Sequence, residues 1–215
     1  VIGVKEGKKD APTVMLAAHM DEIGLMVKNI TKEGFVQFAK IGGIDDRILI
    51  AQKVIVHTDK ETIAGIVGSK PPHILEEEEK KKVIEADELF IDIGANDQKD
   101  AQKMGIRVGD AVSFDIKFTK VGKDAILGKA FDDRAGCAAL IETMKRLPQV
   151  DSTIYATGTV QEEVGLRGAT IAAFQIYPDI GIALDVTVAG DTPGIKEVEA
   201  PVKMRKGPAL TLSLI

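Results

Sequence analysis

Two adjacent glutamates, Glu162 and Glu163, directly follow an apolar run from Ile154 to Val160. The run predicts a buried strand. Because neighbouring side chains of an extended chain point to opposite sides, we expect the two carboxylates to have different roles. Two unneutralised carboxylates at the end of a core strand are costly without a cation or hydrogen bonds. A bound metal ion would compensate them, and a solvated pair at a strand end is the alternative interpretation.

A histidine and an aspartate follow an earlier apolar run in the same way. Residues 13–18 predict a second buried strand, which leads into His19 and Asp21. These two residues alternate by two and therefore share a face of an extended chain. An acid beside a histidine can orient the imidazole for a metal ion or for proton transfer. A surface histidine at a strand end is the alternative.

Further acids occur at comparable positions. Asp185 follows residues 181–184, which predict another buried strand. Asp132 and Asp133 precede a helix whose apolar residues, from Cys137 to Leu147, recur at helical spacing. One of the two aspartates can cap that helix, but a cap does not account for both.

The elements that carry these residues alternate between strand and helix, which predicts an α/β layer with mostly parallel strands. Ligands of such sheets bind at the carboxyl ends of the strands. The candidate residues all fall at this edge, and they are His19, Asp132, Asp133, Glu162, Glu163 and Asp185. A set of His, Asp and Glu suits zinc, cobalt or manganese.

The middle of the chain has a different character. Short β-branched runs alternate there with glycine-containing turns, and the runs are residues 34–38, 53–57, 62–68 and 111–118. We predict a small β domain at 25–121, inserted into a catalytic domain made of 1–24 and 122–215. Asp97 to Met104 predicts one short helix, ended by Gly105. His57 and His73 have no acid at ligand spacing, and we assign them no role.

Composition limits the function classes. The 215 residues are 45% hydrophobic and 28% charged, with a net charge of -5 and a pI near 5.3, which argues against nucleic acid as a partner. No apolar run is long enough to cross a bilayer, so we expect no membrane association. The single cysteine excludes an internal disulfide and predicts a reducing, cytoplasmic location. The chain begins near Val1 and ends at Leu210–Ile215 inside predicted strands, so we expect a catalytic domain that is incomplete at both ends.

The sequence resembles the M42 family of metallo-aminopeptidases, which includes tetrahedral, dodecameric archaeal enzymes and members once described as endoglucanases. The resemblance rests on Ala18-His19-Met20-Asp21-Glu22-Ile23-Gly24, Gly128-Lys129-Ala130-Phe131-Asp132-Asp133-Arg134-Ala135-Gly136, Val160-Gln161-Glu162-Glu163-Val164-Gly165 and Ala183-Leu184-Asp185-Val186. It implies a three-layer α/β peptidase core, interrupted by a PDZ-like β-barrel that serves as the dimerisation domain.

The resemblance also implies a role for each residue. His19 and Asp185 bind one of two divalent ions, Zn²⁺ or Co²⁺, Glu163 binds the other, and Asp132 bridges both. Asp21 orients His19, Glu162 is the general base, and the Asp132–Asp133 peptide is cis. The family's last ligand is a histidine downstream, and no histidine follows Asp185 here. The resemblance therefore implies either a longer natural chain or an incomplete second metal site.

The implied reaction is release of N-terminal amino acids from short peptides by a water held between the two metal ions. The implied assembly is a homo-oligomer, in which dimers form a larger shell such as a dodecamer. Alternatives are another co-catalytic zinc hydrolase (a carboxypeptidase, dipeptidase or deacylase) and a non-catalytic assembly module. A glycanase is disfavoured, because it needs two carboxylates across a sugar, whereas Glu162 and Glu163 are adjacent and should diverge.

Overall fold

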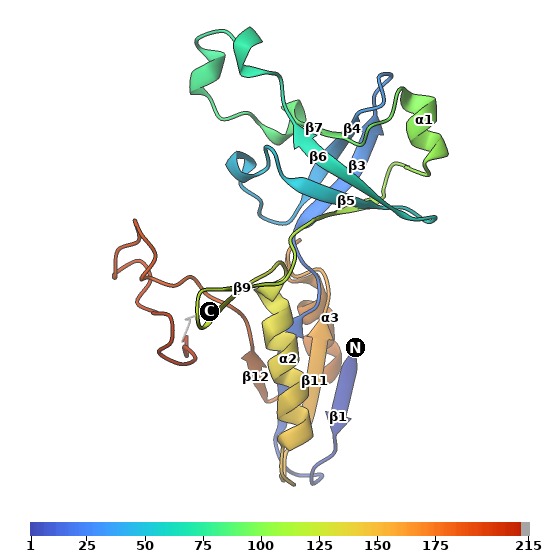
Figure 1. Cartoon of the computed structure of the whole chain (residues 1–215). Helices are drawn as coiled ribbons and strands as arrows, with labels where there is room; N and C mark the ends of the chain where they lie inside the picture. The colour runs from blue at the N-terminus through green and yellow to red at the C-terminus, as the bar shows by residue number, and fades with distance from the viewer. Residues whose placement is uncertain (212–215) are drawn as a thin grey trace.

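The computed structural model describes residues 1–211 and contains a four-stranded sheet with two helices and, beyond it, a separate β-barrel (Figure 1). The strands of the sheet run in the order β1-β11-β2-β12, and their bounds are Ile2–Lys5, Thr153–Thr159, Thr13–His19 and Ile180–Ala183. β2 pairs in parallel with β11 and with β12, whereas β1 pairs antiparallel with β11. The register places Thr159 opposite His19, so β11 and β2 end at the same edge.

Two helices pack against this sheet. α2 (Phe131–Arg146) lies in front of it and α3 (Arg167–Ile176) behind it in the view of Figure 1. Leu140 of α2 packs against Ala18 and Ala156, which project from the central strands β2 and β11. Burial of this apolar face holds α2, and therefore its N-terminal residues, at the carboxyl edge of the sheet. In residues 1–211 no helix has the length and apolar character of a membrane span.

The predicted strands of the sheet are confirmed in place, with one correction. β2 and β11 match the runs at 13–18 and 154–160 to within one residue at each end. The run at 181–184 forms β12, but this strand is not buried, since Ile180 and Ile182 are 49% and 48% exposed. Within the described residues β12 is the edge of the sheet and pairs only with β2. Of the strand predicted at 210–215, Leu210 and Thr211 have no regular structure and 212–215 lie outside the described residues.

Between β2 and α2 the chain forms a closed barrel, in the order β3-β4-β7-β6-β5-β8. The bounds of β3 to β8 are Gly24–Ile30, Val36–Ile41, Lys53–His57, Thr62–Gly68, Phe90–Asp92 and Ala111–Phe114. Alternate residues point inward, as in β5, where Val54 and Val56 are buried and their neighbours are not. The larger apolar core of the protein lies here, and closure leaves no strand edge unpaired.

Short elements complete the barrel region. Asp97 caps the predicted helix, α1 (Gln98–Lys103), by accepting the N–H of Asp100. Four 3₁₀ turns lie at Asp46–Ile48, Pro72–Ile74, Glu79–Lys81 and Ala86–Glu88. A hairpin of β9 (Thr119–Val121) and β10 (Ala125–Leu127) then leads to α2. Of the run predicted at 111–118, only 111–114 form a strand, β8, and 115–118 have no regular structure. β3 and β7 had no prediction of their own.

Candidate metal centre

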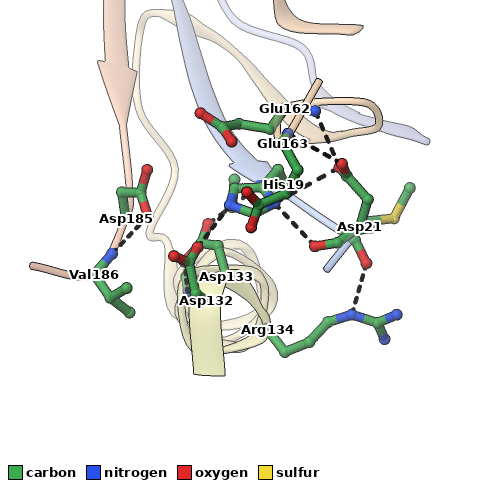
Figure 2. Close-up of polar contacts among 12 residues, drawn as sticks. His19, Asp21, Asp132, Asp133, Arg134, Glu162, Glu163, Asp185 and Val186 are labelled. Atoms are coloured by element: carbon green, nitrogen blue, oxygen red, sulfur yellow. Dashed lines mark hydrogen bonds and ion pairs between the residues drawn. The ribbon is translucent and has the colours of Figure 1, made fainter. Parts of the chain in front are cut away.

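The carboxyl edge of the sheet brings together the residues that sequence reasoning selected (Figure 2). β2 ends at His19, and the following N–H, of Met20, donates to Thr159 O at 2.9 Å, which keeps the ends of β2 and β11 side by side. Potential ligand atoms of His19, Asp132 and Glu163 all lie within 4.8 Å of one another. The same is true of a second group, which consists of His19, Asp133 and Asp185.

His19 is the centre of both groups. Its residue is only 3% exposed, its Nε2 lies 2.8 Å from Asp132 Oδ1, and its Nδ1 lies 3.0 Å from the carbonyl oxygen of Asp21. A ring protonated on both nitrogens donates to both acceptors. Burial lowers the pKa of His19, but the hydrogen bond to Asp132 and the Asp132 charge outweigh it, so the pKa is raised. A divalent ion in place of the Nε2 proton would leave Nδ1–H donating to Asp21, which is the usual arrangement of a metal-binding histidine.

Asp21 connects the two strand ends. Its carboxylate accepts the N–H of Glu162 at 3.2 Å and that of Glu163 at 3.3 Å. The carboxylate is 3.6 Å from His19 Nδ1, so the closer contact with the ring is made by the Asp21 carbonyl. Asp21 therefore fixes the turn that carries both glutamates as well as the histidine ring.

The two glutamates lie in a turn after β11, not in extended chain, and Gln161 before them has a φ of 60°. Figure 2 shows their carboxylates at different places, and only Glu163 belongs to a candidate metal group. Burial, followed by the charges of Asp132 and Glu162, raises the pKa of Glu163. A carboxylate in this position gains from a nearby cation, which is the condition that a metal ion would satisfy.

Asp133 is completely buried and is the residue whose part sequence reasoning missed. Its Oδ1 accepts the N–H of Gly136 at 2.9 Å, which is the capping contact that was predicted for one of the aspartates. Its Oδ2 accepts the backbone N–H of His19 at 3.1 Å, a contact that the sequence did not indicate. Burial raises the pKa of Asp133 despite these two hydrogen bonds. The only sequence signal was that two adjacent aspartates exceeded what one helix cap requires.

The start of α2 also differs from the prediction. The helix begins at Phe131, before the two aspartates rather than after them, and its geometry is interrupted at Asp132 and Asp133. The peptide bond between these aspartates is cis, as the resemblance implied. The interruption directs Asp132 toward the His19 ring and Asp133 toward the His19 backbone.

The donor set fits divalent metal ions. It combines one imidazole with carboxylates from three separate elements, and carboxylates of this kind would repel one another without a cation. Of the two residues that form the His19–Asp132 contact, Asp132 is the accessible one, with its side chain 55% exposed. Small molecules can therefore reach this edge of the sheet. Asp185 is also exposed, and its Oδ1 accepts the N–H of Val186 at 2.7 Å.

Comparison with known proteins assigns the chain to a family. The sequence profile of the family described as M42 glutamyl aminopeptidase matches residues 1–213. The chain is 42% identical to the putative aminopeptidase FrvX of Escherichia coli (strain K12), over 97% of this chain and 58% of that protein. A TET aminopeptidase from a marine sediment archaeon, Thaumarchaeota archaeon, has 42% identity and a TM-score of 0.90, over 96% of this chain and 58% of that one.

A further solved structure concerns assembly. The TET1 peptidase of Pyrococcus horikoshii, whose description states that it can assemble into a tetrahedron or a large octahedral shell, is 36% identical with a TM-score of 0.77. The match covers 91% of this chain and 60% of that one. The chain thus spans somewhat more than half the length of the relatives that it matches. The profile match, together with identity above 40% across nearly the whole chain, shows that the chain belongs to the M42 family of aminopeptidases.

Proposed function

We propose that the protein is a metal-dependent aminopeptidase that removes N-terminal residues from short peptides. The observation that carries the proposal is the convergence of His19, Asp132 and Glu163 at the carboxyl edge of the sheet, with Asp185 in a second group that shares His19. Aminopeptidases among its relatives support the reaction class.

We assign the ligands of two divalent ions, zinc or cobalt, as follows. His19 and Asp185 would hold one ion, Glu163 would hold the other, and Asp132 would contribute to both. Catalytic zinc sites commonly use three protein ligands and leave a position open for water or substrate. The family resemblance implies a further histidine ligand for the second ion downstream of Asp185, and residues 186–215 contain none. Either a longer natural chain would supply this ligand or the second metal site would be incomplete.

Glu162 is the proposed general base. When bound, a pair of divalent ions lowers the pKa of water and polarises a scissile carbonyl. Glu162 is held by the hydrogen bond from its N–H to Asp21, and it belongs to neither candidate metal group. Its carboxylate is therefore available to take a proton from water and pass it to the leaving amine. The surrounding acids would also attract the free α-amino group of a peptide, which favours attack at the N-terminal bond.

The barrel has a proposed role in assembly. Residues 25–121 would form a PDZ-like dimerisation domain within a catalytic domain made of 1–24 and 122–215, and dimers would build a larger, dodecameric shell. Assembly of a family relative into a tetrahedron or an octahedral shell supports this proposal. A cytoplasmic location fits the single cysteine, Cys137.

The test uses Glu162→Gln, with Glu142→Gln as a matched control on the exposed side of α2. Metal content is measured by elemental analysis, and hydrolysis is followed on an aminoacyl chromogenic substrate and on its N-acetylated form. We expect Glu162→Gln to keep its metal and lose at least about 100-fold in kcat, because a general base contributes roughly that much. Undiminished hydrolysis by Glu162→Gln would refute the assignment, and release of acetate from the acetylated substrate, without release of its chromophore, would indicate a deacylase instead.

A further inference from the structure

The backbone of His19 lies where β2 loses one of its neighbouring strands. Pairing between β2 and β12 ends at Ala17 and Ala183, and Leu184 N donates the last bond to Ala17 O at 2.8 Å. Alternate residues of a strand face the same neighbour, so the N–H and C=O of His19 point to the side that β12 has left. Both are buried polar groups that need partners.

Two side chains of α2 provide those partners. Asp133 Oδ2 accepts the N–H of His19 at 3.1 Å, and Cys137 Sγ donates to the C=O of His19 at 3.1 Å. Asp133 and Cys137 are four residues apart and so lie on one side of the helix. The start of α2 therefore replaces β12 as the hydrogen-bonding neighbour of β2 at this one residue.

Gly136 makes room for the contact. Its N–H donates to Asp133 Oδ1 at 2.9 Å, and a Cβ at this position would lie 2.3 Å from the same oxygen. A larger residue would displace the Asp133 carboxylate from its buried site. Both oxygens of Asp133 are thus occupied by backbone N–H donors, one from α2 and one from β2.

We propose that Asp133 and Cys137 are positioning residues that fix the His19 imidazole against Asp132, and that Asp133 is not a metal ligand. This inference rests on the proposed metal centre. Asp133 forms a candidate metal group with His19 and Asp185, so its proximity alone fits either role. The hydrogen bonds decide between them, because Asp133 reaches the backbone of His19 while Asp132 reaches the Nε2 of its ring. Since Asp132 and Asp133 are adjacent, the start of α2 positions both the proposed ligand, Asp132, and the histidine that Asp132 faces, His19.

The experiment compares Asp133→Asn, Cys137→Ala and Cys137→Ser, with Asp151→Asn as a control at an exposed ion pair with Lys8. Co²⁺ affinity and stoichiometry are measured by visible absorption and chelator competition, without a substrate. We expect Asp133→Asn to weaken Co²⁺ binding about 10- to 100-fold, as changes behind a metal ligand do. Cys137→Ala should weaken it less, and Cys137→Ser should restore it because a hydroxyl can donate in place of the thiol. The Co²⁺ stoichiometry and band positions should remain those of the unchanged protein.

The result separates positioning from ligation. Loss of a bound ion or a new Co²⁺ spectrum in Asp133→Asn, with Cys137→Ala unchanged, would make Asp133 a ligand and overturn the proposal. A lower melting temperature with unaltered Co²⁺ affinity in both variants would leave only a structural role, and would also overturn it.

A second measurement does not depend on metal. Hydrogen exchange of the His19 amide, followed by NMR in metal-free protein, should be slow in the unchanged chain and at least tenfold faster in Asp133→Asn. Equal exchange rates would overturn the proposal. If the unchanged protein binds no Co²⁺, the proposed function fails, and the exchange rates still decide whether Asp133 holds His19.

Discussion

Adding one methyl group at Gly42, by the substitution Gly42→Ala, tests whether the barrel restrains Glu163. This glycine follows β4, has a φ of 85°, and lies against the candidate metal centre. A Cβ built on it would lie 2.6 Å from Ile23 Cγ2 and 3.1 Å from Glu163 Oε2. Gly42→Ala should therefore strain the backbone and also push the Glu163 carboxylate.

Two other glycines of the barrel separate these effects. Gly43 has nothing within 4 Å of its Cβ position, so Gly43→Ala should be nearly neutral. Gly109 has a φ of 96° and equally open surroundings, so Gly109→Ala should cost about 1–2 kcal/mol, the cost of a left-handed alanine. Gly42→Ala should cost that amount plus about 1–3 kcal/mol for overpacking, unless Ile23 and Glu163 move. If Glu163 moves, and the changed position of its carboxylate costs about 1.4 kcal/mol of metal-binding free energy, the metal affinity drops about tenfold.

The assay measures unfolding of metal-free protein in denaturant and Co²⁺ affinity by chelator competition in all three variants. We expect Gly42→Ala to weaken Co²⁺ binding, while Gly109→Ala loses stability alone. Equal Co²⁺ affinity in Gly42→Ala and Gly109→Ala would show that the barrel does not restrain Glu163, and the reasoning would be wrong.

Three further outcomes follow from the site geometry. His19→Ala should lose bound metal by elemental analysis, whereas His57→Ala, at an exposed histidine that contacts Ser113, should keep it; equal metal contents would contradict the assignment. Asp21→Asn should weaken metal binding about tenfold or more, because an amide replaces one of the two oxygens that accept the backbone N–H groups of the glutamate turn with an NH₂ donor; an unchanged Kd would count against that connection. The pKa values of His19 and Glu163 are raised in the folded, metal-free protein. Protonation of these two groups therefore stabilises the metal-free fold at pH values below their unfolded pKa values, and this stabilisation is lost as the pH rises through their folded pKa values. Metal affinity should change in the opposite direction and fall on acidification, because protons compete for the same atoms; parallel pH profiles of metal-free stability and metal affinity would refute this.

Much of the site could be predicted because it lies where strands end. Apolar runs of six or seven residues identify β2 and β11, and the polar residues that follow such runs must meet at one edge if the strands are parallel. The pairing of Thr159 with His19 realises this geometry. Alternating short runs likewise predicted most of the barrel strands, although a run of three residues such as β7 carries too little pattern to be recognised.

What the sequence did not reveal depends on neighbours in space. The pattern of Ile180 to Ala183 is that of a core strand, yet its exposure is set by whether another element covers the edge of the sheet. The contact of Asp133 with the His19 N–H required knowledge of where β12 leaves β2, since only then does this N–H lack a strand partner. The periodicity of apolar residues indicates which face of an element is buried. It does not indicate which side chain supplies the hydrogen bond where the pairing of two strands ends.

The position of the barrel in the chain bears on how the metal centre is held. The chain leaves β2 through residues 20–23, enters the barrel, and returns through the β9–β10 hairpin to α2. His19 and Asp132 thus lie at the two ends of the insertion, and Asp21 within the outgoing connection binds the glutamate turn. Gly42 of the barrel lies beside Glu163 of the same turn. We therefore expect a displacement of the barrel relative to the sheet to change the position of Glu163 relative to the His19–Asp132 pair. If the protein assembles through the barrel as proposed, we expect it to bind the second metal ion more tightly when assembly fixes the barrel than when the barrel is free. Co²⁺ affinity should then depend on protein concentration across the range where the proposed oligomer dissociates. Affinity that stays constant while sedimentation shows dissociation would mean that the barrel and the metal centre are energetically independent.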